Sequence, residues 1–291
     1  MNAELFFETQ ALLGEGAIWD SFLNKLLWVD IEGKSLNMLN VETLENKVFA
    51  MPKRIGTVVS INMQKVLVAL EDGIATVDIE EGTLEYQRNT NIHLAHNSRF
   101  NDGKCDPVGR FWVGTLSMSG IERVSSLYCM DQEFSLTTKI EGVSISNGIA
   151  WDAKRCVMYY IDTPTGTIVE YDYDEKIGAI SNSREVIKID SQMGFPDGMT
   201  IDEEGMLWVA LWDGFGVIRI DPKSGSIVEK IDVQAPKVTS CAFGGQDFTT
   251  LFITTARVEM SDEELEKYPL SGSIFSIETG VKGVKSYSFK Q

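Results

Sequence analysis

The stretch GMTIDEEGMLWVAL, residues 198–211, contains the pattern that decides the fold. It consists of an apolar strand, a short polar turn and a second strand rich in aromatic and β-branched residues. The same pattern occurs five more times along the chain. The other segments are GAIWDSFLNKLLWVDI (16–31), VVSINMQKVLVAL (58–70), GKCDPVGRFWVGT (103–115), GIAWDAKRCVMYYIDT (148–163) and AFGGQDFTTLFITTA (242–256).

The spacing of these segments indicates a repeat architecture. One bulky residue anchors each second strand, and successive anchors are 40, 44, 48, 48 and 44 residues apart. The anchors are Trp28, Val68, Trp112, Tyr160, Trp208 and Phe252. A period in this range is typical of units with about four strands each. The sequence therefore predicts an all-β, six-bladed β-propeller with four strands per blade, forming a single domain over residues 1–291.

The two ends of the chain are expected to meet in the last blade. Residues 273–289 supply only part of a blade, and residues 3–8 (AELFFE) offer the missing strand. We predict that this N-terminal strand closes the ring, because a propeller must cover its last edge. The alternative is an independent terminal strand. Residues 262–268 form the single segment with a helical pattern.

Composition excludes several classes of partner. The chain has 26 Lys and Arg against 43 Asp and Glu, a formal net charge of −17. Nucleic acids and anionic membrane surfaces require a cationic footprint, so we expect neither as a partner. No signal peptide or membrane-spanning segment is recognisable. The four cysteines form no CxxC pair and lie in or beside apolar segments, which predicts buried thiols and a cytoplasmic location.

Polar residues occupy one shared position in four of the six repeats. Glu15 and Asn147 lie 13 residues before their anchors, whereas Asn101 and Asp197 lie 11 residues before theirs. The difference matches the longer first turn of the first and fourth repeats. Each of the four therefore begins an innermost strand at the same end of the central channel, here called the top. The matching positions of the other two repeats lie near Thr57 and Cys241.

Equivalent positions around one axis face one another, so these carboxylates and carboxamides should converge. Buried like charges repel strongly unless a cation neutralises them. Oxygen ligands of this kind suit Ca²⁺, Mg²⁺ or Mn²⁺. We predict one divalent metal ion, with Ca²⁺ preferred and Mg²⁺, Mn²⁺ or Zn²⁺ as alternatives. The competing interpretation is that the Asp-Gly and Asn-Gly pairs are ordinary turns.

Arg99 adds a cation to the same rim. It precedes Asn101 by two residues, which places both side chains on one face of a strand. A guanidinium there can bind hydroxyls or a carboxylate of a polar substrate. The alternative is that Arg99 merely pairs with Asp102 or a loop carboxylate. His93 and His96, the only histidines, are expected to have no ligand role.

Two loops after the anchor strands are expanded, at residues 116–126 and 256–271. The strand directions place both loops on the top face, above the shared position. They would act there as a lid or as specificity walls. The alternative is that they are surface insertions without a role.

Several segments carry a resemblance that spans residues 12–257. They are LLGEGAIWD, RFNDGKCDPVGRFWVGT, SNGIAWD, YYIDT, FPDGMTIDEEGMLWVALWDG, GVIRIDPKSG and TSCAFGG. In these segments and their order the chain resembles the family of gluconolactonase, regucalcin and senescence marker protein. The resemblance implies a six-bladed propeller and a metal-dependent sugar lactonase.

The resemblance also implies roles for individual residues. Glu15 in LLGEG and Asn147 in SNG match metal ligands of the family. Asp197 in PDGM matches an aspartate that binds metal and serves as the general acid/base. Arg99 and Asn101 in RFND match substrate contacts.

One stretch departs from the family. Some members place a glutamate contact shortly after the GT of the third repeat, where this chain has Leu-Ser-Met-Ser at 116–119. Glu122 is near but not aligned, so the substrate preference of regucalcin should not be transferred to this chain.

The implied reaction is hydrolysis of aldonolactones, such as glucono- or pentonolactones, to aldonic acids. The metal ion would act as a Lewis acid, and Asp197 would move the proton. Two alternatives remain open: a calcium-dependent esterase or phosphotriesterase on the same scaffold, and a non-catalytic calcium-binding regulatory propeller.

Overall fold

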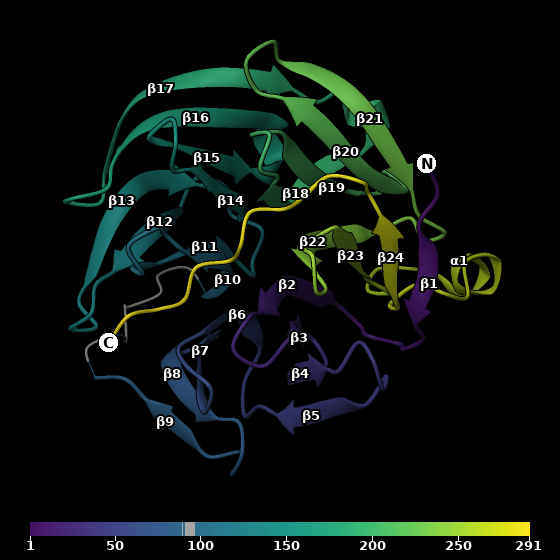
Figure 1. Cartoon of the computed structure of the whole chain (residues 1–291), viewed down its shortest axis with the longest axis horizontal. Coiled ribbons are helices and arrows are strands. Elements are labelled where there is room, and N and C mark those ends of the chain that lie inside the picture. The colour runs from purple at the N-terminus through teal and green to yellow at the C-terminus, as the bar shows by residue number, and fades with distance from the viewer. Residues whose placement is uncertain (89, 91–96) are drawn as a thin grey trace.

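Six four-stranded antiparallel sheets stand in a ring in the computed structural model, which describes residues 1–88, 90 and 97–291 (Figure 1). The predicted all-β, six-bladed propeller is thereby confirmed. Blade 1 contains β2 (Gly14–Asp20), β3 (Lys25–Asp30), β4 (Ser35–Leu39) and β5 (Asn46–Ala50). Blade 2 contains β6 (Ile55–Ser60), β7 (Lys65–Leu70), β8 (Gly73–Asp78) and β9 (Leu84–Tyr86). Blade 3 contains β10 (Ser98–Cys105), β11 (Phe111–Ser117), β12 (Ser125–Met130) and β13 (Leu136–Val143).

The other three blades follow the same order from the channel outward. Blade 4 contains β14 (Ser146–Asp152), β15 (Val157–Asp162), β16 (Thr167–Asp174) and β17 (Ala179–Lys188). Blade 5 contains β18 (Phe195–Ile201), β19 (Leu207–Trp212), β20 (Gly216–Asp221) and β21 (Ser226–Asp232). Blade 6 contains β22 (Val238–Gly244), β23 (Thr250–Thr255), β24 (Ile274–Glu278) and β1 (Glu4–Phe7).

The second strand of each blade carries the core. All six anchor residues lie on these strands, and all are buried. In β7 (KVLVAL) every residue after the first is buried. Blades pack face to face around the ring, so both faces of these strands are covered. Their sequences are therefore continuously apolar rather than alternating between apolar and polar residues. The first strands are buried for the same reason, and their polar residues therefore need partners within the protein or a ligand.

The N-terminal strand closes the ring, as predicted. β1 pairs antiparallel with β24, and Glu4 and Leu5 lie opposite Ser276 and Phe275. The last blade therefore combines strands from both ends of the chain (Figure 1). The predicted helical turn is also present as α1 (Asp262–Lys267), which begins with a capping box between Ser261 and Glu264.

The segment after β24 crosses the bottom of the channel, where the first and second strands of each blade are joined. Figure 1 shows it as the yellow trace over the centre of the ring. Backbone amides of Val284, Phe289 and Lys290 donate to carbonyls of Ile201, Ser60 and Gly109 at 3.0, 2.8 and 3.0 Å. The segment thus contacts blades 2, 3 and 5 and covers the channel from below. Access for a ligand is left to the top.

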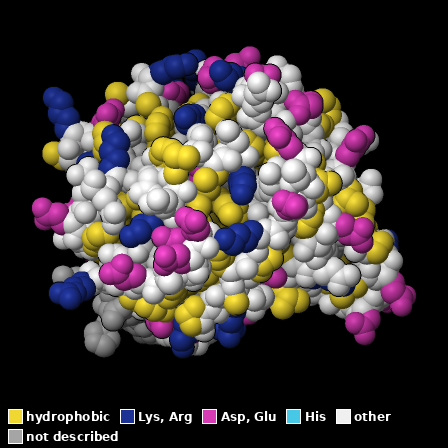
Figure 2. Space-filling view, turned by 60° about the horizontal axis from the view of Figure 1, so that its bottom comes forward, with side chains coloured by type: hydrophobic (Ala, Val, Ile, Leu, Met, Phe, Trp, Pro, Cys, Tyr) yellow, Lys and Arg dark blue, Asp and Glu magenta, His cyan; other side chains and the backbone are white. Residues whose placement is uncertain are grey.

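The acidic excess is spread over the surface. Figure 2 shows one face, on which Asp and Glu lie interspersed with Lys and Arg. No helix of the described residues is long and apolar enough to cross a membrane. All four cysteines are free thiols. Three are buried as predicted, but Cys156 is exposed because it lies in the turn after β14, with a positive φ of 55°.

Candidate functional site

The four residues of the shared register position meet at the top of the channel. Glu15, Asn101, Asn147 and Asp197 come from the first strands of blades 1, 3, 4 and 5, and all line one cavity. Each side chain is at most 7% exposed. A register irregularity lies at this position in β2, β10, β14 and β18. A bulge re-aims side chains, which explains how residues of a first strand turn toward the channel.

The two amides are fixed by hydrogen bonds across neighbouring blades. Nδ2 of Asn101 donates to the carbonyl of Ser146 at 2.7 Å and to Oδ1 of Asn147 at 3.1 Å. Nδ2 of Asn147 donates to Oγ1 of Thr163 at 2.8 Å, and the Thr163 hydroxyl donates to the carbonyl of Pro196 at 2.8 Å. Each amide nitrogen is therefore occupied, and the amide oxygens are held toward the ring.

The carboxylates of the site are buried with few hydrogen-bond partners; among the described residues Oε2 of Glu15 accepts from the backbone amide of Gly16 at 2.9 Å. Oδ1 of Asp197 is buried without a hydrogen-bond partner in the described part of the chain. Burial, followed by the charges of Glu15 and Asp102, raises the pKa of Asp197 well above its usual range. Burial and the charge of Asp102 raise the pKa of Glu15 to about 8. Like charges held together in a low dielectric produce such shifts.

Asp102 is a third carboxylate that the register argument left out. It is 5% exposed, its Oδ1 accepts from the amide of Gly103 at 2.7 Å, and its Oδ2 is buried with no partner among the described residues. Burial raises the pKa of Asp102. The sequence motifs indicate Asp102 only as a possible partner of Arg99. The register irregularity between Phe100 and Gly103, which the sequence does not reveal, lies at this residue.

Lys104 is a second residue of the site that the sequence analysis did not identify. Its ammonium group donates to the carbonyl of Met199, so the side chain reaches from β10 to β18. The charge of Lys104 lowers the pKa of Glu15 and of Asp102, against the larger effect of burial. Lys104 thus compensates part of the negative charge from below, and the oxygens at the top of the channel remain available.

Arg99 lies beside Asn101 as predicted. Its Nη1 donates to Oδ1 of Asn101 at 2.7 Å and to the carbonyl of Phe100 at 2.9 Å. Among the described residues Arg99 forms no ion pair with Asp102; the charge of the loop carboxylate Glu32 does act on Arg99, so the second half of that alternative stays open. Burial lowers the pKa of Arg99 to about 10, and the charges of Glu32 and Glu15 oppose this shift. A buried guanidinium with free donors is suited to bind acceptors of a ligand.

The remaining register positions offer no ligand oxygen to the ring. Oγ1 of Thr57 donates to the carbonyl of Gly103 at 2.9 Å, and Sγ of Cys241 donates to the carbonyl of Trp208 at 3.5 Å. Blades 2 and 6 therefore use this position for contacts to neighbouring blades. His93 and His96 lie outside the described residues.

The donor set fits a hard divalent cation. Over the described ranges, no group of three or more His, Cys, Asp or Glu forms a metal cluster by itself. A mixed set does exist, since Glu15 and Asp197 supply carboxylate oxygens and Asn147 an amide oxygen. The partnerless Oδ1 of Asp197 and the repulsion between the carboxylates are what a bound cation would relieve.

The cavity above these residues has a volume of about 610 Å³, the size of a site for a small molecule. Both expanded loops line it, the first through Leu116, Ser117, Met118 and Gly120, and the second through Val258 and Glu259. Their predicted position on the top face is confirmed. Whether they move as a lid stays a prediction.

A family model described as "SMP-30/Gluconolactonase/LRE-like region" matches residues 13–257. The chain belongs to this family. A Bacillus subtilis (strain 168) protein named "Putative sugar lactone lactonase YvrE" is 41% identical over 283 residues, 96% of each chain. Regucalcin of Danio rerio is 37% identical over 292 residues, covering 99% of this chain and 98% of that protein.

Solved structures of the SMP-30/gluconolactonase/LRE-like family have the same fold. A calcium-binding protein, regucalcin, from Agrobacterium tumefaciens is 26% identical, with a TM-score of 0.93 over 100% of this chain and 98% of that one. A luciferin-regenerating enzyme is 30% identical, with a TM-score of 0.90 over 97% and 96% of the two chains. The resemblance inferred from the sequence motifs is thereby confirmed.

Proposed function

We propose that the protein is a metal-dependent lactonase that opens aldonolactones, such as glucono- or pentonolactones, to aldonic acids. The observation that carries the proposal is the convergence of Glu15, Asn147 and Asp197 in one cavity, with an oxygen of Asp197 that has no hydrogen-bond partner among the described residues. Membership of a family whose relatives bear lactonase and gluconolactonase names supports the reaction class.

Glu15, Asn147 and Asp197 would hold the metal ion, and Ca²⁺ is our first choice because every donor is a neutral or anionic oxygen. The name of the Agrobacterium relative, a calcium-binding protein, agrees with this choice. When bound, the cation would supply Lewis-acid polarisation of the lactone carbonyl.

The protein residues orient the substrate and transfer the proton. Arg99 and Asn101, which are joined by a hydrogen bond, orient the substrate through its hydroxyl groups. Asp197 accepts a proton from the water that attacks the carbonyl carbon, as a general base. The bond between the acyl carbon and the ring oxygen breaks, and Asp197 returns the proton to that oxygen. One water is consumed, and the product is the open hydroxy acid.

The test is metal removal followed by a substrate panel. We expect chelation to abolish hydrolysis of gluconolactone and pentonolactones, and stoichiometric Ca²⁺, Mg²⁺, Mn²⁺ or Zn²⁺ to restore it to different degrees. Undiminished turnover after chelation would refute the metal mechanism. Turnover of aryl esters or phosphotriesters alone would favour the esterase alternative, and metal binding without any turnover would favour a regulatory propeller.

The free cysteines agree with the cytoplasmic location that the sequence predicts. We retain that location as part of the proposal. Fractionation of cells that express the protein at native level tests it.

A further inference from the structure

A charged cluster lines the cavity beside Arg99 and has no role in the reaction proposed above. Arg54, just before β6, donates through Nε to both carboxylate oxygens of Glu32 at 2.8 and 2.9 Å. Nη1 of Arg54 donates to Oε2 of Glu71 at 3.3 Å. The three residues come from loops of blades 1 and 2, so the cluster joins separate segments at the top of the ring.

Two members of this cluster face the same cavity as Asp197. Glu32 and Arg54 both line it, whereas Glu71 lies behind Arg54 and does not. Their side chains are 29% and 33% exposed, so a ligand can reach them. No hydrogen bond to a described residue involves Nη2 of Arg54. The pair therefore presents a free donor next to a carboxylate acceptor.

A weak hydrogen bond from Arg54 to a thioether sulfur also restrains this pair. Sδ of Met118 lies 3.8 Å from Nη1 of Arg54, and Met118 belongs to the expanded loop after β11. That loop brings no charge to the cavity from residues 116–120. The cavity lining also contains Pro164, Phe195, Trp212 and Val258, which are apolar or aromatic, and the carboxylate of Glu259. The lining thus combines charged side chains with apolar and aromatic ones.

The charge of the cavity lining indicates which ligands it accepts. Its cationic side chains are Arg54 and Arg99, and its carboxylates are Glu15, Glu32, Asp197 and Glu259. The lining has no net positive charge, so it gives no advantage to a phosphate or carboxylate substituent. A donor beside an acceptor matches neighbouring hydroxyl groups, each of which can both accept and donate. The apolar and aromatic residues of the lining suit the apolar C–H face of a sugar ring.

We propose that Glu32 and Arg54 form a specificity subsite that binds hydroxyl groups of the substrate beyond those held by Arg99 and Asn101. This inference rests on the proposed lactonase function and narrows it to neutral, polyhydroxylated lactones. Phosphorylated lactones are rejected by the Glu32 carboxylate. Glu71 is not part of the subsite, because it does not line the cavity and the two shorter bonds to Glu32 already fix Arg54.

The experiment compares Glu32→Gln and Arg54→Met with the wild-type protein on three substrates: a polyhydroxylated aldonolactone, an unsubstituted ring lactone and a phosphorylated aldonolactone. Loss of a charged hydrogen bond to a substrate hydroxyl raises KM by about tenfold, with little change in kcat. We expect that rise for the polyhydroxylated lactone and an effect at least fivefold smaller for the unsubstituted ring. Glu32→Gln should also reduce the ratio between the KM for the phosphorylated aldonolactone and the KM for the unphosphorylated one.

Glu71→Gln is the matched control, since it removes a carboxylate from the same cluster but not from the cavity. Its KM should stay within about threefold of wild type. Equal increases in KM for all three lactones would mean a structural role and would overturn the subsite, as would wild-type KM values in both variants. If the wild-type protein opens no lactone at all, the proposed function fails and the subsite fails with it.

Discussion

A buried aspartate lies near each end of β18, and the two differ in the hydrogen-bond partners of their carboxylate oxygens. Asp202, just beyond the bottom end, has every oxygen occupied. Its Oδ2 accepts from Nε1 of Trp208 at 2.9 Å and from Nη2 of Arg219 at 2.7 Å, and its Oδ1 accepts from two backbone amides. Asp197, near the top end, has a buried oxygen with no partner in the described part of the chain.

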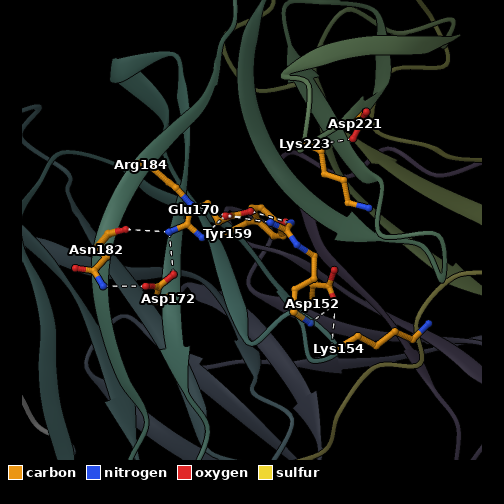
Figure 3. Close-up of polar contacts among 10 residues, drawn as sticks. Asp152, Lys154, Tyr159, Glu170, Asp172, Asn182, Arg184, Asp221 and Lys223 are labelled. Carbon is orange, nitrogen blue, oxygen red and sulfur yellow. Dashed lines mark hydrogen bonds and ion pairs between the residues drawn. The ribbon is translucent and has the colours of Figure 1, made fainter.

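The same contrast separates the rest of the molecule from the channel. Asp106 at the bottom of blade 3 accepts from Arg110, Trp112 and Tyr173. Glu170 on β16 accepts from Arg155 and from Arg184 of β17. Figure 3 shows Glu170 and Arg184 on these two outer strands of blade 4. These buried carboxylates are thus compensated within the fold, whereas Asp197 and Asp102 each keep a buried oxygen without a partner among the described residues.

The largest expected effect comes from Asp197→Asn. The substitution removes both a metal ligand and the proton acceptor, so we expect lactone hydrolysis to fall at least about 10³-fold in kcat. The amide has the same shape, and the metal-free fold should keep its thermal stability because a buried charge is lost. Steady-state kinetics and thermal unfolding on the same preparation measure both quantities. Activity within tenfold of wild type would move the general base to another residue.

The fold and the centre of the site could be predicted because both follow from the repeat. Six copies of one strand pattern determine the propeller, and counting back from the anchors finds Glu15, Asn101, Asn147 and Asp197. These four residues can be identified without knowledge of tertiary contacts, because equivalent positions of a repeat converge by symmetry. Arg99 lies outside this register and follows from its spacing of two residues from Asn101. The family resemblance added which residues bind the metal and which one transfers the proton.

Residues outside the repeat could not be found in this way. Glu32 and Arg54 lie in loops of different blades, and only the folded chain brings them together. Lys104 lies in the strand pattern, but its reach across the channel to Met199 depends on the diameter of the ring. The exposure of Cys156 depends on the conformation of a single turn, which the apolar flanks did not reveal.

The second effect in size comes from Asp202→Asn, the same substitution at the other end of β18. It weakens a buried pair and leaves Arg219 without full compensation, so we expect a loss of about 3 kcal/mol in unfolding free energy. Activity of the folded protein at low temperature should stay within about twofold of wild type. Urea denaturation measures the loss of stability, and activity assays at 10 °C measure any loss of catalysis separately. An unchanged urea midpoint would contradict the structural role assigned to the paired aspartates.

The smallest effect, counted per pH unit, is the pH dependence of the unfolding free energy that Glu15 contributes. The pKa of Glu15 rises from an ordinary 4.5 to about 8 on folding, so between these values the folded chain binds more protons than the unfolded one. The stability of the metal-free protein contributed by Glu15 is therefore full below about pH 4.5 and is lost as the pH rises toward 8. The slope is at most about 1.4 kcal/mol per pH unit for each proton released.

Other carboxylates titrate in the same range, so the measurement is the difference between wild type and Glu15→Gln in urea denaturation at several pH values. We expect the variant to gain stability relative to wild type as the pH rises, and Asp202→Asn to keep the wild-type slope. Ca²⁺ should reduce the difference for wild type, because it competes with protons for the same oxygens. A difference curve that is flat from pH 5 to 8 would mean that burial does not raise the pKa of Glu15 in solution, and uncompensated carboxylates at the top of the channel would then not explain the site.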